Sequence, residues 1–144
     1  MNALAKEYLQ LSELTYQNQM TTDEKQQRSH RDFPVWKAAM LLAETVYDIS
    51  AKFPADERFG LTAQIRRSAV SIPSNIAEGA GRSSTGELGH FLGIALGSAA
   101  ELETQLELAD RLNLIDKTDD TTEAFDQLED VRKQLILFRR SLKA

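Results

Sequence analysis

Hydrophobic residues recur every three or four positions along most of the chain, and this spacing predicts amphipathic α-helices. The first long segment begins at Asp32, a candidate N-cap, with Pro34 in its first turn, and it ends near Pro54. Its expected core face is Trp36, Ala39, Met40, Ala43, Val46 and Tyr47. We therefore expect one helix here, with its polar face turned to water.

A second helix is expected from about Asp56 to Gly79 and Gly81, because glycines near the end of a helical pattern stop it. Its apolar stripe is Phe59, Thr62, Ile65, Ala69, Ile72 and Ile76. Pro73 falls inside this segment, and we expect a kink there because its ring displaces the carbonyl group four residues earlier.

The next two segments have the longest periodic patterns. Ser84 and Glu87 fit a capping box that starts the third helix. Its seam is Leu88, Phe91, Ala95, Ser98, Leu102, Gln105, Ala109 and Leu112. The fourth helix is expected from near Thr118, with the core face Phe125, Leu128, Val131, Leu135, Phe138 and Leu142. Short loops between long helices require antiparallel neighbours, so residues 32–144 are predicted to form an all-α, up-down antiparallel four-helix bundle.

Residues 1–31 are expected to form an N-terminal arm outside this bundle. Leu4, Tyr8, Leu11 and Leu14 recur at helical spacing, which is compatible with a short helix. Residues 17–31 are polar and have no apolar stripe, so we interpret them as a linker.

Composition limits the classes of function. The 144 residues include no cysteine, which excludes disulfides, thiolate metal sites and thiol nucleophiles. No apolar run reaches the roughly 18 residues of a membrane span, and no signal-peptide pattern opens the chain, so we expect a cytoplasmic protein. The net charge of −5 argues against nucleic acid as the main partner. That total combines an acidic block over residues 101–130 with basic blocks over residues 58–82 and 131–144.

Residues that could carry catalysis are few. Glu87 and His90 match the E-x-x-H motif of di-metal bundles once, but there is no second copy and both lie off the apolar seam. We interpret His90 as a solvated polar residue. The carboxylates Glu101, Glu103, Glu107 and Asp110 scatter over a polar helix face. We therefore expect no enzyme activity, no cofactor and no metal site.

Four glycines form a stripe on the third predicted helix. Gly86, Gly89, Gly93 and Gly97 lie opposite its apolar seam. Glycine inside a helix costs about 0.5–1 kcal/mol relative to alanine, so its repetition on one face needs a reason. Either long side chains on both sides cover a tolerated bare face, or a helix of another subunit approaches closely. We favour the second alternative, which makes these four glycines candidate interface residues.

A polar stripe lies on the back of the second predicted helix, opposite its apolar stripe. Its members are Gln64, Arg67, Ser71, Ser74, Asn75 and Glu78. Arg67 and Glu78 are about 16 Å apart along the helix, too far to pair with each other. The stripe is either an ordinary wet surface or a second subunit contact. In the second case the candidate interface residues are Arg67, Ser71, Ser74, Asn75 and Glu78.

Basic residues gather around the second helix and at the end of the chain. The candidates for contact with nucleic-acid phosphates are Arg58, Arg66, Arg67, Arg82, Arg139, Arg140 and Lys143. Cations at the end of the last helix are also explained by the helix dipole, without any ligand. Repetition around an oligomer would nevertheless build a basic ring that attracts phosphates.

Several short motifs resemble a known family. They include Val35-Trp36, Phe53-Pro54, Phe59-Gly60-Leu61 and Arg66-Arg67, and the most specific is Ser71-Ile72-Pro73-Ser74-Asn75-Ile76-Ala77-Glu78-Gly79. Over residues 32–143 the sequence resembles the bacterial four-helix-bundle family of 23S rRNA intervening-sequence proteins. That family also contains the accessory variability determinant of diversity-generating retroelements.

The resemblance implies an up-down bundle that assembles as a ring, known as a homopentamer in family members, and no enzyme activity. For the retroelement branch it implies a positively charged oligomer that binds nucleic acid and the reverse transcriptase. The matching basic positions are Arg66, Arg67 and Arg82, and the signature polar pair is Asn75 and Glu78. Three positions that are commonly basic in the family are here Ser83, Gly86 and His90, which argues against nucleic-acid binding.

These observations predict a non-enzymatic homo-oligomer whose partner is itself, in a pentameric ring, and whose cellular role the residues do not specify. The alternative is a nucleic-acid-binding accessory protein, with RNA or DNA as its partner. It would act with a reverse transcriptase or with an rRNA intervening sequence.

Overall fold

The computed structural model describes residues 2–21, 29–116 and 119–143, with side chains described except at 13–21 and 119–120. The described residues form α-helices and short 3-10 helices and contain no strand. The α-helices are α1 (Ala3–Thr21), α2 (Pro34–Ser50), α3 (Leu61–Ala80), α4 (Thr85–Arg111) and α5 (Asp119–Ser141). The 3-10 helices are η1 (His30–Asp32) and η2 (Ala55–Glu57).

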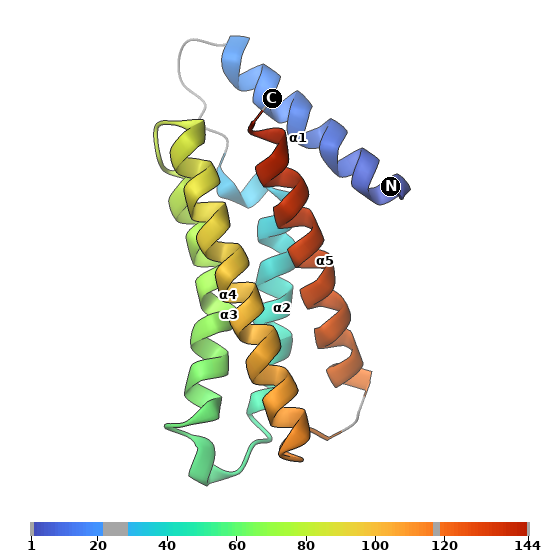
Figure 1. Ribbon diagram of the computed structural model, residues 1–144, viewed down its shortest axis with the longest axis vertical. Coiled ribbons are helices and arrows are strands. Elements are labelled where there is room, and N and C mark those ends of the chain that lie inside the picture. The colour runs from blue at the N-terminus through green and yellow to red at the C-terminus, as the bar shows by residue number, and fades with distance from the viewer. Residues whose placement is uncertain (1, 22–28, 117–118, 144) are drawn as a thin grey trace.

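Helices α2 to α5 form the up-down antiparallel bundle that the sequence predicts (Figure 1). Helix α3 packs against α2 and α4, and α5 packs against the same two helices, so the four helices enclose one interior. The α3–α4 connection and the C-terminus lie at one end of the bundle, whereas η2 and the α4–α5 connection lie at the other. The all-α prediction is confirmed.

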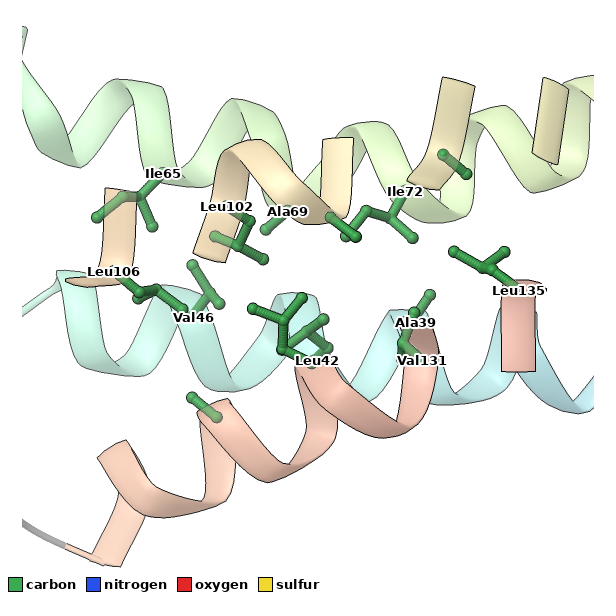
Figure 2. Packing of buried hydrophobic residues seen from close by; sticks show 14 of the residues in the cluster. Ala39, Leu42, Val46, Ile65, Ala69, Ile72, Leu102, Leu106, Val131 and Leu135 are labelled. Atoms are coloured by element: carbon green, nitrogen blue, oxygen red, sulfur yellow. The ribbon is translucent and has the colours of Figure 1, made fainter. Parts of the chain in front are cut away.

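The core consists of branched aliphatic side chains from all four helices, which point toward one another in Figure 2. The labelled members include Leu42, Val46, Ile65, Ile72, Leu102, Leu106, Val131 and Leu135, each at most 1% exposed. Burial of one such side chain contributes about 1.5–3 kcal/mol relative to exposure. The hydrophobic interior of the bundle is therefore its main source of stability.

The residue at which a helix starts depends on its N-cap. The sequence predicts one of these N-caps correctly. The Ser84 Oγ accepts a hydrogen bond from the Glu87 N–H at 3.2 Å, so Ser84 is confirmed as the N-cap of α4. The Glu87 carboxylate accepts from the Ser84 hydroxyl, whereas a full capping box would have it accept from the Ser84 backbone N–H. Asp32 is not the N-cap of α2, because it lies in η1 and Phe33 occupies the cap position. Helix α3 starts at Leu61 rather than near Asp56. It continues through Pro73 as one helix to Ala80, with Gly81 as its C-cap.

Three of the expected core faces are wrong in part. The buried face of α2 is Val35, Ala39, Leu42, Val46 and Ile49, whereas the predicted Met40 and Tyr47 are 39% and 43% exposed. Apolar residues cover more than half the circumference of α2, so periodicity alone cannot select the buried side. Phe59 is 88% exposed because α3 begins after it. In the third predicted seam, the last residue, Leu112, is also exposed.

Helix α1 packs along α5 as a fifth helix (Figure 1). Tyr8 is buried, and its ring meets that of Phe138 edge to face with centroids 6.1 Å apart. The expectation of an arm separate from the core is therefore wrong at Tyr8, which joins the bundle's buried cluster. Residues 17–21 of the expected linker are helical. The side chain of Leu14, the rest of that linker over 22–28, and Thr118 lie outside the described residues.

Candidate interaction surfaces

One edge of the polar stripe on α3 faces α4 within the same chain. The Ser71 and Ser98 hydroxyls share a hydrogen bond of 2.8 Å, and Asn75 Nδ2 donates to the Ser71 carbonyl oxygen at 2.8 Å. Ser68 Oγ donates to Gln105 Oε1 at 2.8 Å, and both of these side chains are buried. Burying polar groups is favourable only when they are paired. The structure therefore places Ser71 and Asn75 in a polar seam that joins α3 to α4.

The other edge of the stripe is open. Glu78 pairs with Arg82, one turn further along the chain, at 2.6 Å rather than with Arg67. Both partners are about half exposed, so this pair contributes little to stability. Arg67 and Ser74 are exposed, and Arg67 forms no ion pair with any described residue. The candidate residues Arg67, Ser74 and Glu78 thus remain on the surface of α3.

The glycine stripe of α4 lies beside the end of α5. The Arg139 guanidinium covers Gly93, since a Cβ built there would lie 3.1 Å from Arg139 Cζ. A Cβ on Gly89 would lie 3.9 Å from Leu142 Cδ1. A Cβ on Gly86 would lie 3.9 Å from Oγ of Ser84, the N-cap of the same helix. A Cβ on Gly97 would meet nothing within 4 Å. Long side chains therefore cover the middle of the stripe, while its two ends are open.

Gly79, which the sequence suggested only as a helix stop, has a packing role. It lies inside α3 and is buried, and a Cβ on it would lie 2.8 Å from Phe91 Cβ. Only glycine allows α3 and α4 to approach this closely. The signal was present in the sequence, because Gly79 continues the buried stripe three residues after Ile76.

Several of the candidate phosphate-binding residues are engaged within the chain. Arg66 Nε donates to Ser50 Oγ at 2.8 Å, and its guanidinium lies 4.5 Å from the centre of the Tyr47 ring. Arg66 therefore joins α3 to the end of α2. Arg82 lies over the ring of Phe91 at 5.0 Å and also pairs with Glu78.

The antiparallel pairing of α4 and α5 separates the charges along the bundle axis. The second half of α4 runs beside the first half of α5, so the acidic block over residues 101–130 gathers at one end (Figure 1). Four candidate basic residues lie toward the opposite end, on α5 and at the α3–α4 connection: Arg82, Arg139, Arg140 and Lys143. Arg58, next to η2, lies at the acidic end. The seven candidates therefore do not form one patch.

An open groove of about 610 Å³ lies between α2 and α3. Its lining residues are His30, Trp36, Met40, Ala43, Glu44, Tyr47, Asp48, Val70, Pro73, Ser74 and Ala77. The His30 ring meets the Trp36 ring edge to face at 5.1 Å. The groove contains four of the six α2 residues that the sequence assigned to the core: Trp36, Met40, Ala43 and Tyr47. Apolar residues on two adjacent helices thus form a surface that no described residue covers.

The structure adds little to the case for metal chemistry. Within the described residues, no group of three or more histidine, cysteine, aspartate or glutamate side chains is placed to hold a metal ion. His90 is exposed, and the Glu87 carboxylate accepts a hydrogen bond from the Ser84 hydroxyl. In the same part of the chain, no helix combines the length and the apolar character needed to span a membrane.

Comparison with known proteins supports the fold and the family. The structure is similar to the crystal structure of a protein with unknown function from the S23 ribosomal protein family of Bacteroides thetaiotaomicron VPI-5482. That similarity has a TM-score of 0.67 and 26% sequence identity, and covers 74% of this chain and 95% of that chain. No curated protein matches the sequence. The model of the family described as 23S rRNA-intervening sequence protein matches residues 31–137, from η1 into α5. The chain therefore belongs to the family of 23S rRNA-intervening sequence proteins.

Proposed function

We propose that the protein acts as a homo-oligomer, a ring of five subunits, and that it has no catalytic activity of its own. The observation that carries this proposal is the open apolar groove between α2 and α3. Met40, Tyr47 and Val70 are each about two-fifths exposed there, side by side with half-buried Trp36 and Ala43. Contiguous apolar surface on a folded domain marks an interaction site, whereas scattered apolar residues need no explanation.

The choice of five subunits comes from the resemblance set out above, in which family members assemble as homopentamers. The absence of a catalytic role rests on the sparse titratable chemistry of the described surface. The candidate acid or base His90 is exposed, and the carboxylate of the nearby Glu87 accepts a hydrogen bond from the hydroxyl of the N-cap Ser84.

The solution mass of the full chain tests this proposal. Light scattering after size-exclusion chromatography at micromolar concentration should give five times the 16.1 kDa of one chain. Dilution should yield monomers without partly assembled mixtures dominating, as expected for a closed ring. A mass of one chain throughout the micromolar range would overturn the proposal.

A second candidate function is nucleic-acid binding, and the charge separation along the bundle favours it. Arg139, Arg140 and Lys143 follow one another on the last turn of α5 and beyond, at the end opposite the acidic block. In a ring, five copies of this end would lie together and form a basic surface. Such a surface attracts phosphates without reading sequence.

Salt-dependent binding to an RNA or DNA oligonucleotide tests this second function. The double variant Arg140→Ala/Lys143→Ala should weaken binding and reduce the dependence on salt by about one unit of slope per lost phosphate contact. The matched control, Arg67→Ala/Arg111→Ala, removes the same charge from exposed positions elsewhere and should bind like the unmodified chain. The absence of binding at low salt, or equal losses in both variants, would exclude the basic end as the site.

A further inference from the structure

Phe59 is the most exposed large hydrophobic side chain in the described part of the chain. It is 88% exposed and lies in the turn between η2 and α3, at the acidic end of the bundle. The nearby Phe53, six residues earlier, is buried in the core. An exposed phenyl ring lacks the favourable free energy of burial, which a binding partner could supply.

The turn holds Phe59 in place. The Arg58 N–H donates to the Ala55 carbonyl at 3.1 Å, and the Gly60 N–H donates to the Glu57 carbonyl at 3.0 Å. The Glu57 carboxylate accepts from the Leu61 N–H at 3.1 Å and so caps α3. A Cβ on Gly60 would lie 2.9 Å from this carboxylate, so glycine leaves room for the cap. The backbone that carries Phe59 is therefore ordered before any partner binds, which lowers the entropic cost of association.

The α2–α3 groove has the chemistry to receive an aromatic ring. Trp36 and Tyr47 offer edge-to-face partners, and Met40 offers a flexible thioether that adapts to a ring. Two carboxylates, Glu44 and Asp48, also line the groove, and neither forms an ion pair with any described residue. The groove is thus apolar and aromatic, with an acidic border.

Arg58 supplies the complementary charge. Its guanidinium lies 5.4 Å from the centre of the Phe59 ring, so a subunit that binds this ring also meets the positive charge of Arg58. We propose that Phe59 of one subunit inserts into the α2–α3 groove of the next subunit, with Arg58 facing Glu44 and Asp48 of that subunit. This inference rests on the homo-oligomer proposed above and identifies its contact.

The ring cannot fill the groove of its own chain. Val70, the first groove residue on α3, lies nine residues after Leu61, or roughly 13 Å along the helix axis. Arg66 lies between them on α3 and is held to the end of α2 by Ser50 and Tyr47. The inserting residue and the receiving groove are therefore different surfaces of one subunit. Because these surfaces are separate, the contact can repeat head to tail, and contacts of that kind form closed rings when the rotation closes.

The first test compares two single variants by the concentration at which the oligomer dissociates. Phe59→Ala should raise this concentration on the order of thirtyfold or more, as expected when a central aromatic anchor is removed. Leu112→Ala is the matched control, because Leu112 is also an exposed apolar residue at a helix end. It should dissociate like the unmodified chain. Circular dichroism should show both variants fully helical, because both side chains are exposed.

The second test mixes two variants that each lack one half of the contact. Phe59→Ala keeps the groove, and Val70→Glu keeps Phe59 but places a charge in the groove. Each variant alone should be monomeric at a concentration between the one at which the unmodified oligomer dissociates and the higher ones at which the variant oligomers dissociate. Their equimolar mixture should form a heterodimer of twice 16.1 kDa and nothing larger, because only one intact contact remains per pair.

The outcomes separate this inference from the proposal on which it rests. If the unmodified chain is a monomer, the proposed homo-oligomer itself is wrong. If the unmodified chain assembles and Phe59→Ala assembles equally well, the homo-oligomer stands and the Phe59 contact is wrong. A mixture that stays monomeric would also overturn the contact.

Discussion

Gly79 of α3 and Phe91 of α4 lie where the two helices pack too closely for a methyl group on Gly79. A Cβ on Gly79 would lie 2.8 Å from Phe91 Cβ and 3.3 Å from the Leu88 carbonyl oxygen. Neither of these atoms is the flexible end of a side chain, so neither can move without the α4 backbone. The position of α4 against α3 therefore depends on the absence of one methyl group.

We expect Gly79→Ala to lower the free energy of unfolding by about 1–3 kcal/mol, the usual cost of overpacking a core. Urea denaturation followed by circular dichroism measures the change. Gly81→Ala is the control, because its Cβ would meet only ordinary contacts at 3.5 Å or more. Equal stability of the two variants would show that α4 can shift to accommodate a methyl group.

Gly97 is the opposite case on α4, because a Cβ there would meet nothing within 4 Å. Gly97→Ala should therefore raise the free energy of unfolding of the subunit by about 0.5–1 kcal/mol through helix propensity. The assembled mass, measured in parallel by light scattering, should not change if subunits meet through Phe59. A fall in that mass would instead place the glycine stripe in the subunit contact.

Ser68 and Gln105 form a buried hydrogen bond, so we expect that removing one partner destabilises the fold more than removing both. Ser68→Ala should destabilise the fold by about 1–3 kcal/mol, because the buried Gln105 Oε1 loses its donor. The double variant Ser68→Ala/Gln105→Met should regain most of this loss, since both polar groups are then gone. Thr104→Ala, which removes an exposed hydroxyl bonded to the Ala100 carbonyl, is the control and should change little. Additive losses in the double-mutant cycle would argue against the pair.

Tyr8 predicts a loss of stability at alkaline pH. Burial raises the pKa of the Tyr8 phenol above its ordinary value of 10.0, because the buried ring disfavours the phenolate. The protonated phenol is therefore the form that the folded chain prefers. The contribution of this phenol to the free energy of unfolding is complete below pH 10. It declines as the pH rises from 10 toward the raised pKa that Tyr8 has in the folded chain.

Absorbance of the tyrosinate form, measured against pH, checks this prediction. Tyr8→Phe should remove the component that titrates at the highest pH and should make unfolding less sensitive to alkali. If the variant instead loses a component that titrates near pH 10, the phenol of Tyr8 is solvated and α1 is not held to α5 through it.

The helices of this protein could be predicted because helical spacing of apolar residues is a local property. The seam of α4 from Ala95 to Ala109 and the core face of α5 from Leu128 to Phe138 are buried as predicted. In these helices one face is apolar and the other carries glycine or charged residues, so only one orientation buries the apolar side chains. The N-cap at Ser84 is also local, since the Glu87 N–H that it binds lies within one turn.

The buried face of helix α2 could not be predicted from the spacing of its apolar residues. The helix has apolar residues on two faces, and both choices of core satisfy the helical spacing. The positions of α3 and α5 decide that Leu42 is buried and that Met40 lines the groove. Phe59 fits the stripe of α3 by spacing but precedes the helix, because the Glu57 carboxylate caps Leu61 and fixes the start.

By itself the sequence determined the number of bundle helices, their antiparallel order and the family, because each depends on residues close together along the chain. Only the tertiary structure decided which apolar residues lie outside, which glycine has a packing role, and that the acidic block and the basic end of α5 lie at opposite ends of the bundle. These features depend on which faces of neighbouring helices meet, and contacts between residues far apart in the chain select those faces. The groove and Phe59 belong to this second group, which is why the proposed contact becomes visible only in the folded chain.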